Sequence, residues 1–165
     1  MTQNMTQHMA YIGLGANLGD AASQVQHALA ALGKLPSSQL LRSSALYRSA
    51  PIDSSGADYV NAVAELRTSL GALELLHALQ AQELSAGRER PFHNAPRTLD
   101  LDLLMFDEAS FDTPALTLPH PRMHERAFVL APLAELAPEL VIPLRGTVSE
   151  LLARVQSQVC VKIGA

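Results

Sequence analysis

Two aspartates near the middle of the chain have the spacing of side chains that act together. Residues 98–106 read Thr-Leu-Asp-Leu-Asp-Leu-Leu-Met-Phe, and this alternation predicts a β-strand. Asp100 and Asp102 then share one face of the strand, about 7 Å apart, while the neighbouring leucines enter the core. Adjacent carboxylates either repel each other or hold a cation, and such oxygen ligands suit Mg²⁺ that carries substrate phosphates. The plainer alternative is the exposed polar face of an edge strand.

Five arginines lie near this acidic pair in the sequence. They are Arg88, Arg90 and Arg97 before it and Arg122 and Arg126 after it. Guanidinium groups bind phosphate through paired N–H donors, and a metal held by carboxylates neutralises the charge that develops when phosphorus is attacked. Surface salt bridges are the alternative, but the first three arginines lie in an irregular stretch without helical neighbours to pair with. The combination therefore predicts a site for a phosphate-bearing substrate.

The common nucleotide-binding and zinc-binding motifs do not fit the sequence. Gly13-x-Gly15-x-x-x-Gly19 resembles a dinucleotide fingerprint, but its last spacing is one residue too long, and no P-loop is present. His120 and His124 are four residues apart, yet Pro121 follows the first and no third ligand is near. His120 is therefore better interpreted as a hydrogen-bond donor to phosphate.

One aromatic residue and one amide point to recognition of a flat heterocycle. In the predicted strand at 59–66, Tyr59 and Asn61 lie on the less apolar face. A ring can stack on a heterocycle and an amide can read its edge. The alternative is a structural role, with the tyrosine hydroxyl in water.

Composition limits the class of protein. The chain has 165 residues, of which 48% are hydrophobic and 17% charged, with nine Gly and ten Pro, so collagen, coiled-coil and disordered classes are excluded. We expect one domain at 10–165, after a flexible extension at 1–9. The net charge of −4 argues against nucleic acid as a partner, and no apolar run is long enough for a membrane span. Without a signal peptide, and with a single Cys160, the sequence predicts a cytoplasmic protein that binds small molecules.

The order of predicted elements indicates an α+β fold. The patterns favour strands at 10–15, 39–48, 59–66 and 98–106, helices at 20–33 and 71–86, a loop at 49–56, a helical segment at 122–137 that Pro132 breaks, and a final helix at 147–157. Strand, helix, strand, strand, helix, strand is the split βαβ order of ferredoxin-like folds. We therefore expect an antiparallel sheet with helices packed on one face, in which the strand at 59–66 is half-buried. Asp20 is expected to cap the first helix, and Thr147 with Glu150 to form a capping box at the last. The apolar stripe expected on the second helix is Leu73, Leu75, Leu76, Leu79 and Leu84.

Several segments resemble one enzyme family. The matching strings are Ile-Gly-Leu-Gly-Ala-Asn-Leu-Gly-Asp at 12–20, Tyr-Arg-Ser-Ala-Pro at 47–51, Asp-Tyr-Val-Asn-Ala at 58–62, Gln-x-x-Glu-Leu at 80–84, Gly-Arg-Glu-Arg at 87–90, Pro-Arg-Thr-Leu-Asp-Leu-Asp at 96–102 and Leu-Pro-His-Pro-Arg-Met at 118–123. Over roughly residues 10–145 the chain is similar to the 6-hydroxymethyl-7,8-dihydropterin pyrophosphokinase family of folate biosynthesis.

The resemblance implies a reaction and a set of site residues. Members have a ferredoxin-like fold, bind ATP and then the pterin, and release AMP and the pterin diphosphate. By this resemblance Asp100 and Asp102 hold two Mg²⁺ ions and are catalytic together with Arg88 and Arg97. The residues implied to bind ATP are Gln80, Glu83, Arg88, Arg90, Arg97, Leu103, Thr117, His120 and Arg126. Those implied to bind the pterin are Ser49, Ala50, Ile52, Tyr59, Asn61, Asn94 and Phe128.

The chain departs from the family pattern at a few of these positions. Ser49-Ala50 stands where Thr-Pro is common, His93 stands where an arginine is frequent, and Asn94 replaces an aromatic residue of some members. The loops at 49–57 and 87–97 are the expected lids. We expect a monomer. Two other readings fit the acidic pair or the fold: a two-metal phosphohydrolase or nuclease, and a non-catalytic effector-binding module.

Overall fold

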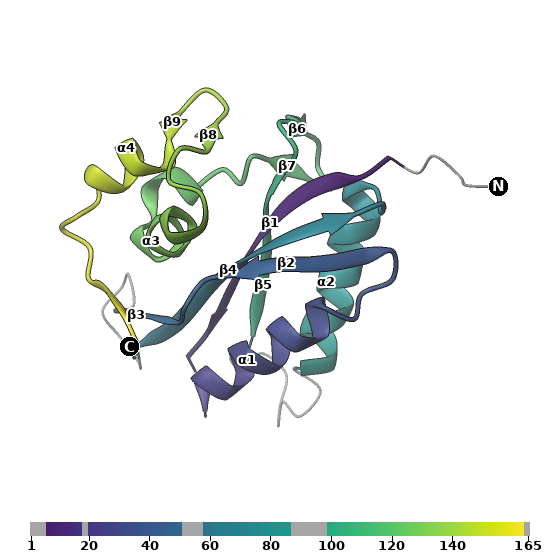
Figure 1. The fold of residues 1–165 in the computed structure, drawn as a ribbon, viewed down its shortest axis with the longest axis horizontal. Coiled ribbons are helices and arrows are strands. Elements are labelled where there is room, and N and C mark those ends of the chain that lie inside the picture. The colour runs from purple at the N-terminus through teal and green to yellow at the C-terminus, as the bar shows by residue number, and fades with distance from the viewer. Residues whose placement is uncertain (1–5, 18–19, 51–57, 87–98, 164–165) are drawn as a thin grey trace.

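The computed structural model of the chain describes residues 6–17, 20–50, 58–86 and 99–163, and it has the expected α+β architecture (Figure 1). Its main sheet has the order β10-β3-β4-β1-β5, with β2 also paired to β4, and every pair is antiparallel. These strands are β1 (His8–Ala16), β2 (Ser38–Ser43), β3 (Tyr47–Ser49), β4 (Tyr59–Thr68), β5 (Asp100–Phe106) and β10 (Cys160–Lys162). β1 therefore takes in the last two residues of the segment that we expected to precede the fold.

The helices and two small hairpins complete the fold. The helices are α1 (Ala21–Leu32), α2 (Ala72–Ala86), α3 (Ala127–Leu136) and α4 (Val148–Ala153), with one 3₁₀ turn, η1 (Met123–Glu125). The hairpins are β6 (Phe111–Asp112) with β7 (Thr117–Leu118), and β8 (Val141–Ile142) with β9 (Gly146–Thr147). Within the described residues, no helix is long and apolar enough to cross a membrane.

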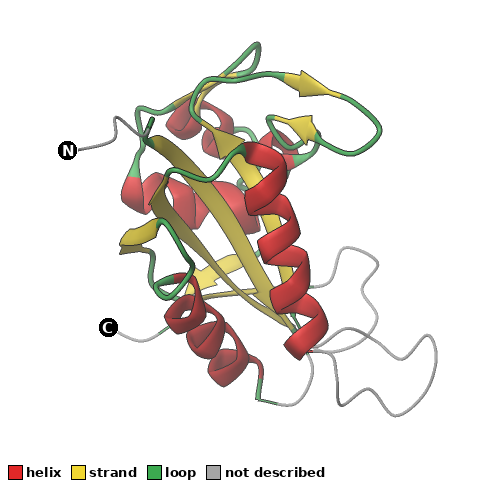
Figure 2. Cartoon of the chain, turned by 90° about the vertical axis from the view of Figure 1, so that its right-hand side faces the viewer, coloured by secondary structure: helices red, strands yellow, loops and turns green. Residues whose placement is uncertain are grey.

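Helices cover both faces of the sheet, so the prediction of helices on one face is wrong. α1 and α2 bury Val25 and Leu75 against one face, in a core that also holds Leu66 of β4. α3 and α4 pack on the other face, where Leu133 joins Val63 of β4 in a second core (Figures 1 and 2). The reason lies in β4, whose residues from 60 to 66 are all buried, so it is a central strand with two apolar faces and not a half-buried one.

Two further predictions, the single strand at 39–48 and the helix break at Pro132, are also wrong. The segment at 39–48 is not one strand, because β2 ends at Ser43 and β3 starts at Tyr47, and both pair with the long β4. Between them Ser44 bonds to Val63 through its own N–H and through its hydroxyl, so side-chain bonding interrupts the strand. α3 continues through Pro132, which lies in its second turn and removes only one possible helical hydrogen bond.

The caps at the starts of α1 and α4 agree with the predictions from the sequence. Asp20 accepts a hydrogen bond from the Ser23 N–H and caps α1, as expected. Thr147 and Glu150 form the expected capping box, although α4 ends at Ala153 and not near residue 157. On α2, Leu73 and Leu84 of the predicted apolar stripe are exposed, at 46% and 75%, so the buried stripe is narrower than expected.

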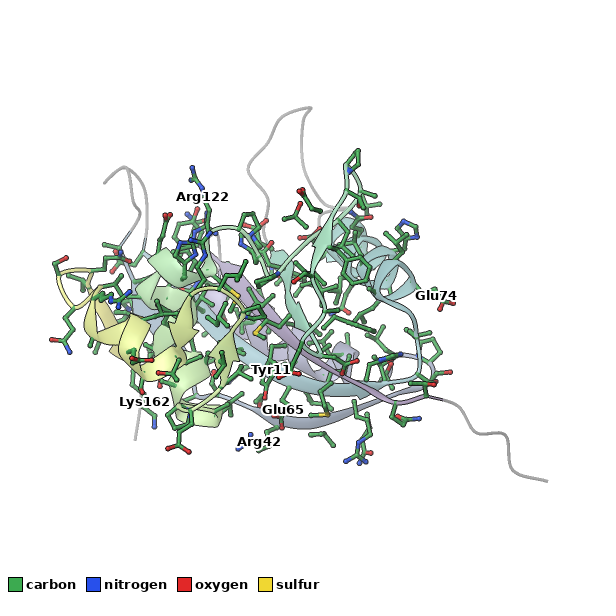
Figure 3. All side chains as sticks on the ribbon, turned by 90° about the horizontal axis from the view of Figure 1, so that it is seen from above. Tyr11, Arg42, Glu65, Glu74, Arg122 and Lys162 are labelled. Carbon is green, nitrogen blue, oxygen red and sulfur yellow. The ribbon has the colours of Figure 1, made fainter. Side chains whose placement is uncertain are left out.

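A polar cluster connects β1, β2 and β4. The Tyr11 hydroxyl donates to Glu65 at 2.6 Å, and Arg42 donates to the same carboxylate from two nitrogens at 3.0 and 3.1 Å. Figure 3 shows the three side chains close together on the sheet. The hydrogen bond from Arg42 is the main cause that lowers the pKa of Glu65, against the opposing effect of burial. Burial raises the pKa of Tyr11 well above its usual value, with Glu65 adding to the shift.

This cluster predicts a loss of stability in acid. The pKa of Glu65 is lower in the folded than in the unfolded chain, so its stabilising contribution is complete above the unfolded value of about 4.5 and is lost as the pH falls through the folded value. We expect Glu65→Gln to flatten the pH dependence of the free energy of unfolding below about pH 4.5, measured by urea denaturation. Glu108→Gln, at an exposed site, is the control; equal slopes for both variants and the unchanged chain would contradict the prediction.

Candidate active site

Two cavities meet at the edge of the sheet formed by β5. The large cavity has a volume of about 600 Å³ and the small cavity about 310 Å³, and Asp102 lines both. The large cavity is lined by Gly13, Leu14, Gly15, Ser49, Ala50, Tyr59, Asn61, Ala62, Asp100, Asp102, Arg126, Phe128 and Val129. The small cavity is lined by Leu76, Gln80, Glu83, Leu101, Asp102, Leu103, Ala115, Leu116, Thr117, His120 and Pro121.

The register of β1 leaves space beside the two aspartates. Asp102 lies opposite Gly13 and Asp100 opposite Gly15, and opposed residues project to the same face of a sheet. The next strand places Asn61 on the far side of Gly15. Because glycine has no side chain, the face between Asn61 and the aspartates stays open, and this open strip is the floor of the large cavity. Gly13-x-Gly15 has the same period of two as Asp100-x-Asp102, and this shared period is the signal in the sequence that indicates the role of the glycines.

The aspartates are as expected from strand alternation. Their side chains are partly exposed, whereas Leu101 and Leu103 are buried in the core on the opposite face. Two carboxylates at one cavity wall fit Mg²⁺, which takes one or two protein carboxylates and fills its other positions with water and substrate phosphate. Within the described ranges, no group of three or more His, Cys, Asp and Glu residues gathers to hold a metal by itself.

The small cavity brings together five residues that the sequence analysis associated with ATP. Gln80 and Glu83 come from α2, Leu103 from β5, Thr117 from β7 and His120 from the turn that follows it. The carboxylate of Glu83 accepts the Leu101 N–H at 2.7 Å, so it holds α2 against the outer edge of β5. The sheet edge and α2 therefore form two walls of the small cavity.

His120 is held so that one ring nitrogen is a donor. Its backbone N–H donates to Leu104, and its Nδ1 accepts the Arg122 N–H at 3.1 Å. Burial is the main cause that lowers the pKa of His120; Arg126 and Arg122 act in the same direction and Asp102 opposes them. The ring is therefore neutral near pH 7, and because Nδ1 accepts, we assign its proton to Nε2. That N–H can donate to an anion.

The opposite wall of the large cavity carries a fixed amide. The Ser49 hydroxyl donates to Oδ1 of Asn61 at 2.7 Å in a buried contact. This bond orients the amide, whose Nδ2 lies so close to Gly15 that a Cβ there would be 3.0 Å away. Arg126 places its guanidinium 5.4 Å from the centre of the Phe128 ring, in a cation–π contact. Tyr59 and Ala50 complete the wall that carries the amide, whereas Arg126 and Phe128, at the start of α3, form a second wall.

The remaining predicted site residues lie outside the described residues. They are Ile52, Arg88, Arg90, Asn94 and Arg97, together with His93 and most of the two expected lid loops. The described part of the chain therefore shows the carboxylate, histidine and amide groups of the site, with Arg126 as the arginine that lines a cavity.

Comparison with known proteins gives the family. The family model described as 7,8-dihydro-6-hydroxymethylpterin-pyrophosphokinase (HPPK) matches residues 11–138. A Pseudomonas aeruginosa protein named 2-amino-4-hydroxy-6-hydroxymethyldihydropteridine pyrophosphokinase is 49% identical over 144 residues, which cover 87% of this chain and 89% of that protein. A Bacillus subtilis protein of the same name is 40% identical over 134 residues, 81% of this chain and 80% of the relative. The chain therefore belongs to the HPPK family.

Solved structures support the fold. The crystal structure of Plasmodium falciparum HPPK-DHPS A437G with STZ-DHP matches with a TM-score of 0.74 at 12% identity, over 94% of this chain and 47% of that one. A structure described as HPPK-DHPS in complex with substrates matches with a TM-score of 0.74 at 11% identity, over 90% of this chain and 43% of that one. This chain thus spans about half the length of these solved structures.

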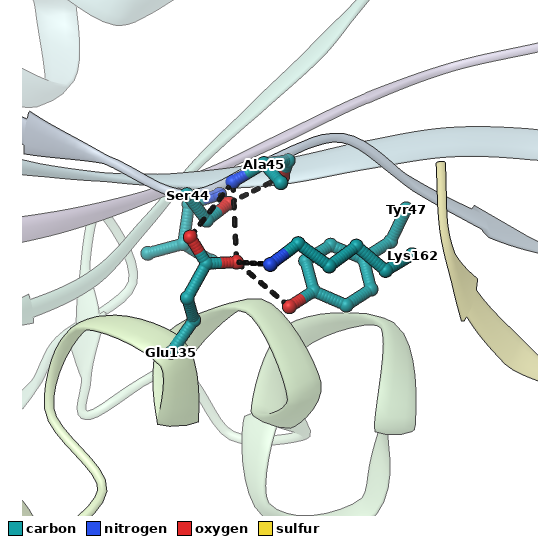
Figure 4. Close-up of polar contacts among 6 residues, drawn as sticks. Ser44, Ala45, Tyr47, Glu135 and Lys162 are labelled. Atoms are coloured by element: carbon teal, nitrogen blue, oxygen red, sulfur yellow. Dashed lines mark hydrogen bonds and ion pairs between the residues drawn. The ribbon is translucent and has the colours of Figure 1, made fainter. Parts of the chain in front are cut away.

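A carboxylate on α3 connects two walls of the large cavity. Glu135 accepts the Ala45 N–H at 3.2 and 3.1 Å and the Tyr47 hydroxyl at 2.8 Å, and Lys162 of β10 lies 3.9 Å away (Figure 4). α3 carries Phe128 at its other end, and β3 carries Ser49 two residues after Tyr47. Glu135 therefore sets the position of one wall relative to the other. No local pattern predicts this role of Glu135, because its partners are about 90 residues away in the chain.

We expect Glu135→Ala to destabilise the protein by about 1–3 kcal/mol, because the Ala45 N–H and the buried Tyr47 lose a charged acceptor. Urea unfolding followed by circular dichroism measures the loss. Glu139→Ala, an exposed glutamate just beyond α3, is the matched control and should stay within about 0.5 kcal/mol of the unchanged chain. Equal stability of the two variants would show that water replaces Glu135 at no cost.

Proposed function

We propose that this chain transfers pyrophosphate from ATP to 6-hydroxymethyl-7,8-dihydropterin, releases AMP and the pterin diphosphate, and so serves folate biosynthesis. Membership of the HPPK family and the names of its relatives support this activity. The observation that carries it is the position of Asp102 on the wall shared by the two cavities, with Asp100 beside it. One cavity is available for each substrate, and the acidic pair lies where their reacting ends meet.

ATP occupies the small cavity in this proposal. Gln80, Glu83, Leu103 and Thr117 surround the nucleoside, while Nε2 of His120 donates to a phosphate oxygen. Asp100 and Asp102 hold two Mg²⁺ ions, which supply charge neutralisation for the triphosphate. Arg126, which lines the neighbouring large cavity, adds a cationic donor to the neutral one of His120. Arg88, Arg90 and Arg97 remain predicted phosphate ligands.

The pterin occupies the large cavity. Its volume of about 600 Å³ is within the usual range for a small-molecule site. Phe128 and Tyr59 offer rings for stacking, and the amide of Asn61, oriented by Ser49, offers a donor and an acceptor to the heterocycle edge. Ala50 forms part of the same wall, and Ile52 and Asn94 remain predicted contacts. This arrangement directs the hydroxymethyl group toward the aspartates.

The chemistry requires mainly positioning and charge stabilisation. The pterin hydroxymethyl oxygen forms a bond to the β-phosphorus, the bond from that phosphorus to the oxygen of the α-phosphate breaks, AMP leaves, and the hydroxyl proton passes to solvent. Arg126 and His120 hold the phosphate oxygens in line for this displacement, and the cavity walls hold the acceptor. We expect the protein to act as a cytoplasmic monomer on these small molecules; its net charge of −4 supports partners other than nucleic acid.

Removing one carboxylate tests the proposal. We expect Asp102→Asn, and likewise Asp100→Asn, to lower AMP formation at least about a hundredfold, because the charge that holds the metal is lost while the shape is kept. Chromatography of the products after incubation with ATP, Mg²⁺ and the pterin measures this. Asp112→Asn, at an exposed position, is the control. Release of phosphate without pterin diphosphate would instead indicate a phosphohydrolase, and ligand binding without ATP consumption an effector module.

Gly15, on the floor of the large cavity, gives an independent test. A Cβ at Gly15 would lie 3.0 Å from Nδ2 of Asn61, so Gly15→Ala should displace the amide. We expect the KM for the pterin to rise about tenfold, on the scale of one lost buried hydrogen bond, while the KM for ATP changes little. Gly33→Ala, at the C-terminal end of α1 and with an ordinary helical backbone, is the control. Equal shifts in both KM values would argue against a local effect on the pterin cavity.

A further inference from the structure

α3 starts without a cap from its own sequence. Its N-cap residue is Arg126, which makes no side-chain capping bond, and arginine is not a residue that caps well. The first N–H groups of a helix have no partner inside the helix and need one from elsewhere. Here the partner is Gln158, 31 residues further along the chain, whose Oε1 accepts the Ala127 N–H at 2.9 Å.

The same side chain also bonds on the other side of Arg126. Nε2 of Gln158 donates to the carbonyl of Glu125 at 2.8 Å, so one amide holds the backbone immediately before and after Arg126. Arg126 and Phe128 both line the large cavity, and the guanidinium of the first lies over the ring of the second. The backbone of Glu125–Ala127, which Gln158 holds, therefore sets the directions in which the side chains of Arg126 and Phe128 point.

Gln158 is itself anchored on both sides. Its backbone N–H donates to Val155 just after α4, and β10 begins two residues later at Cys160. Cys160 pairs with Ser49 of β3, and the Ile163 N–H donates to Leu46 at 2.8 Å. The C-terminal segment 158–163 thus joins the start of α3 to the strand that carries the opposite wall of the large cavity.

We propose that Gln158 is a positioning residue for the large cavity: its amide caps α3 from the C-terminal segment and fixes the directions of Arg126 and Phe128 toward the two substrates. The match to the family model ends at residue 138, so Gln158 lies outside the matched residues. The inference rests on the proposed function for its kinetic consequence, but the hydrogen bonds themselves can be tested without it.

Gln158→Leu removes both hydrogen bonds and keeps a side chain of similar size. We expect the KM for the pterin to rise about fivefold, the scale of one lost helix cap, with a smaller fall in kcat. The Ala127 amide should also exchange its hydrogen faster in NMR measurements, whether or not substrate is present. Gln156→Leu is the matched control, because Gln156 is exposed two residues before Gln158 and makes no side-chain hydrogen bond within the described residues.

Gln158→Glu separates capping from general stability. Its carboxylate can still accept the Ala127 N–H, and negative charge is favourable at a helix start, but it cannot donate to Glu125. We therefore expect a pterin KM between those of the unchanged chain and Gln158→Leu. The assays are run at a temperature at which circular dichroism shows all variants folded.

Two outcomes would overturn the positioning role. One is an unchanged pterin KM in a folded Gln158→Leu variant, and the other is unchanged exchange of the Ala127 amide. If the unchanged chain forms no AMP, the proposed function fails, and the exchange rate of Ala127 still decides whether Gln158 caps α3.

Discussion

The alignment of β1 between β4 and β5 is the constraint on which the rest of the site depends. One row across the sheet places Asp100, Gly15 and Asn61 side by side, and the row next to it places Asp102 beside Gly13. A shift of one residue in either pairing would turn the carboxylates into the core and bring leucines to the cavity. The same register that buries Leu101 and Leu103 therefore exposes the two acidic groups together, and core packing and chemistry are specified by one set of backbone hydrogen bonds.

Long β4 explains why the molecule has two helical layers. Its residues pack against α1 on one side and against α3 on the other, and α2 joins the first layer over β5, so each face supports a separate apolar core. The layer with α1 and α2 supplies Gln80 and Glu83 to the small cavity, while the layer with α3 supplies Phe128 to the large one. The two substrates of the proposed reaction thus approach β5 from different layers of the fold.

The sequence predicted those features that depend on nearby residues. Alternation in the strand at 98–106 gave the acidic pair and its buried neighbours, and the caps at Asp20 and Thr147 were readable because cap and helix are adjacent. Five of the residues that the family resemblance named as ATP ligands line the small cavity. Contacts such as those of Glu135 and Gln158 were not predictable in the same way, because their partners are brought near only by the complete topology. The second helical layer was missed because Asn61 and Glu65 give β4 the alternation of a half-buried strand, although both of its faces are buried.

The course of β10 has a practical consequence for handling the protein. Lys162, in the last strand, pairs with Tyr47 in β3, so the C-terminal end of the described chain lies close to a wall of the large cavity. β1 starts far from there, since His8 pairs with Thr68 at the opposite end of β4 from Tyr59 (Figure 1). An affinity tag or an immobilising linker is therefore better attached at the N-terminal side, because β1 begins at the other end of β4 from the large cavity.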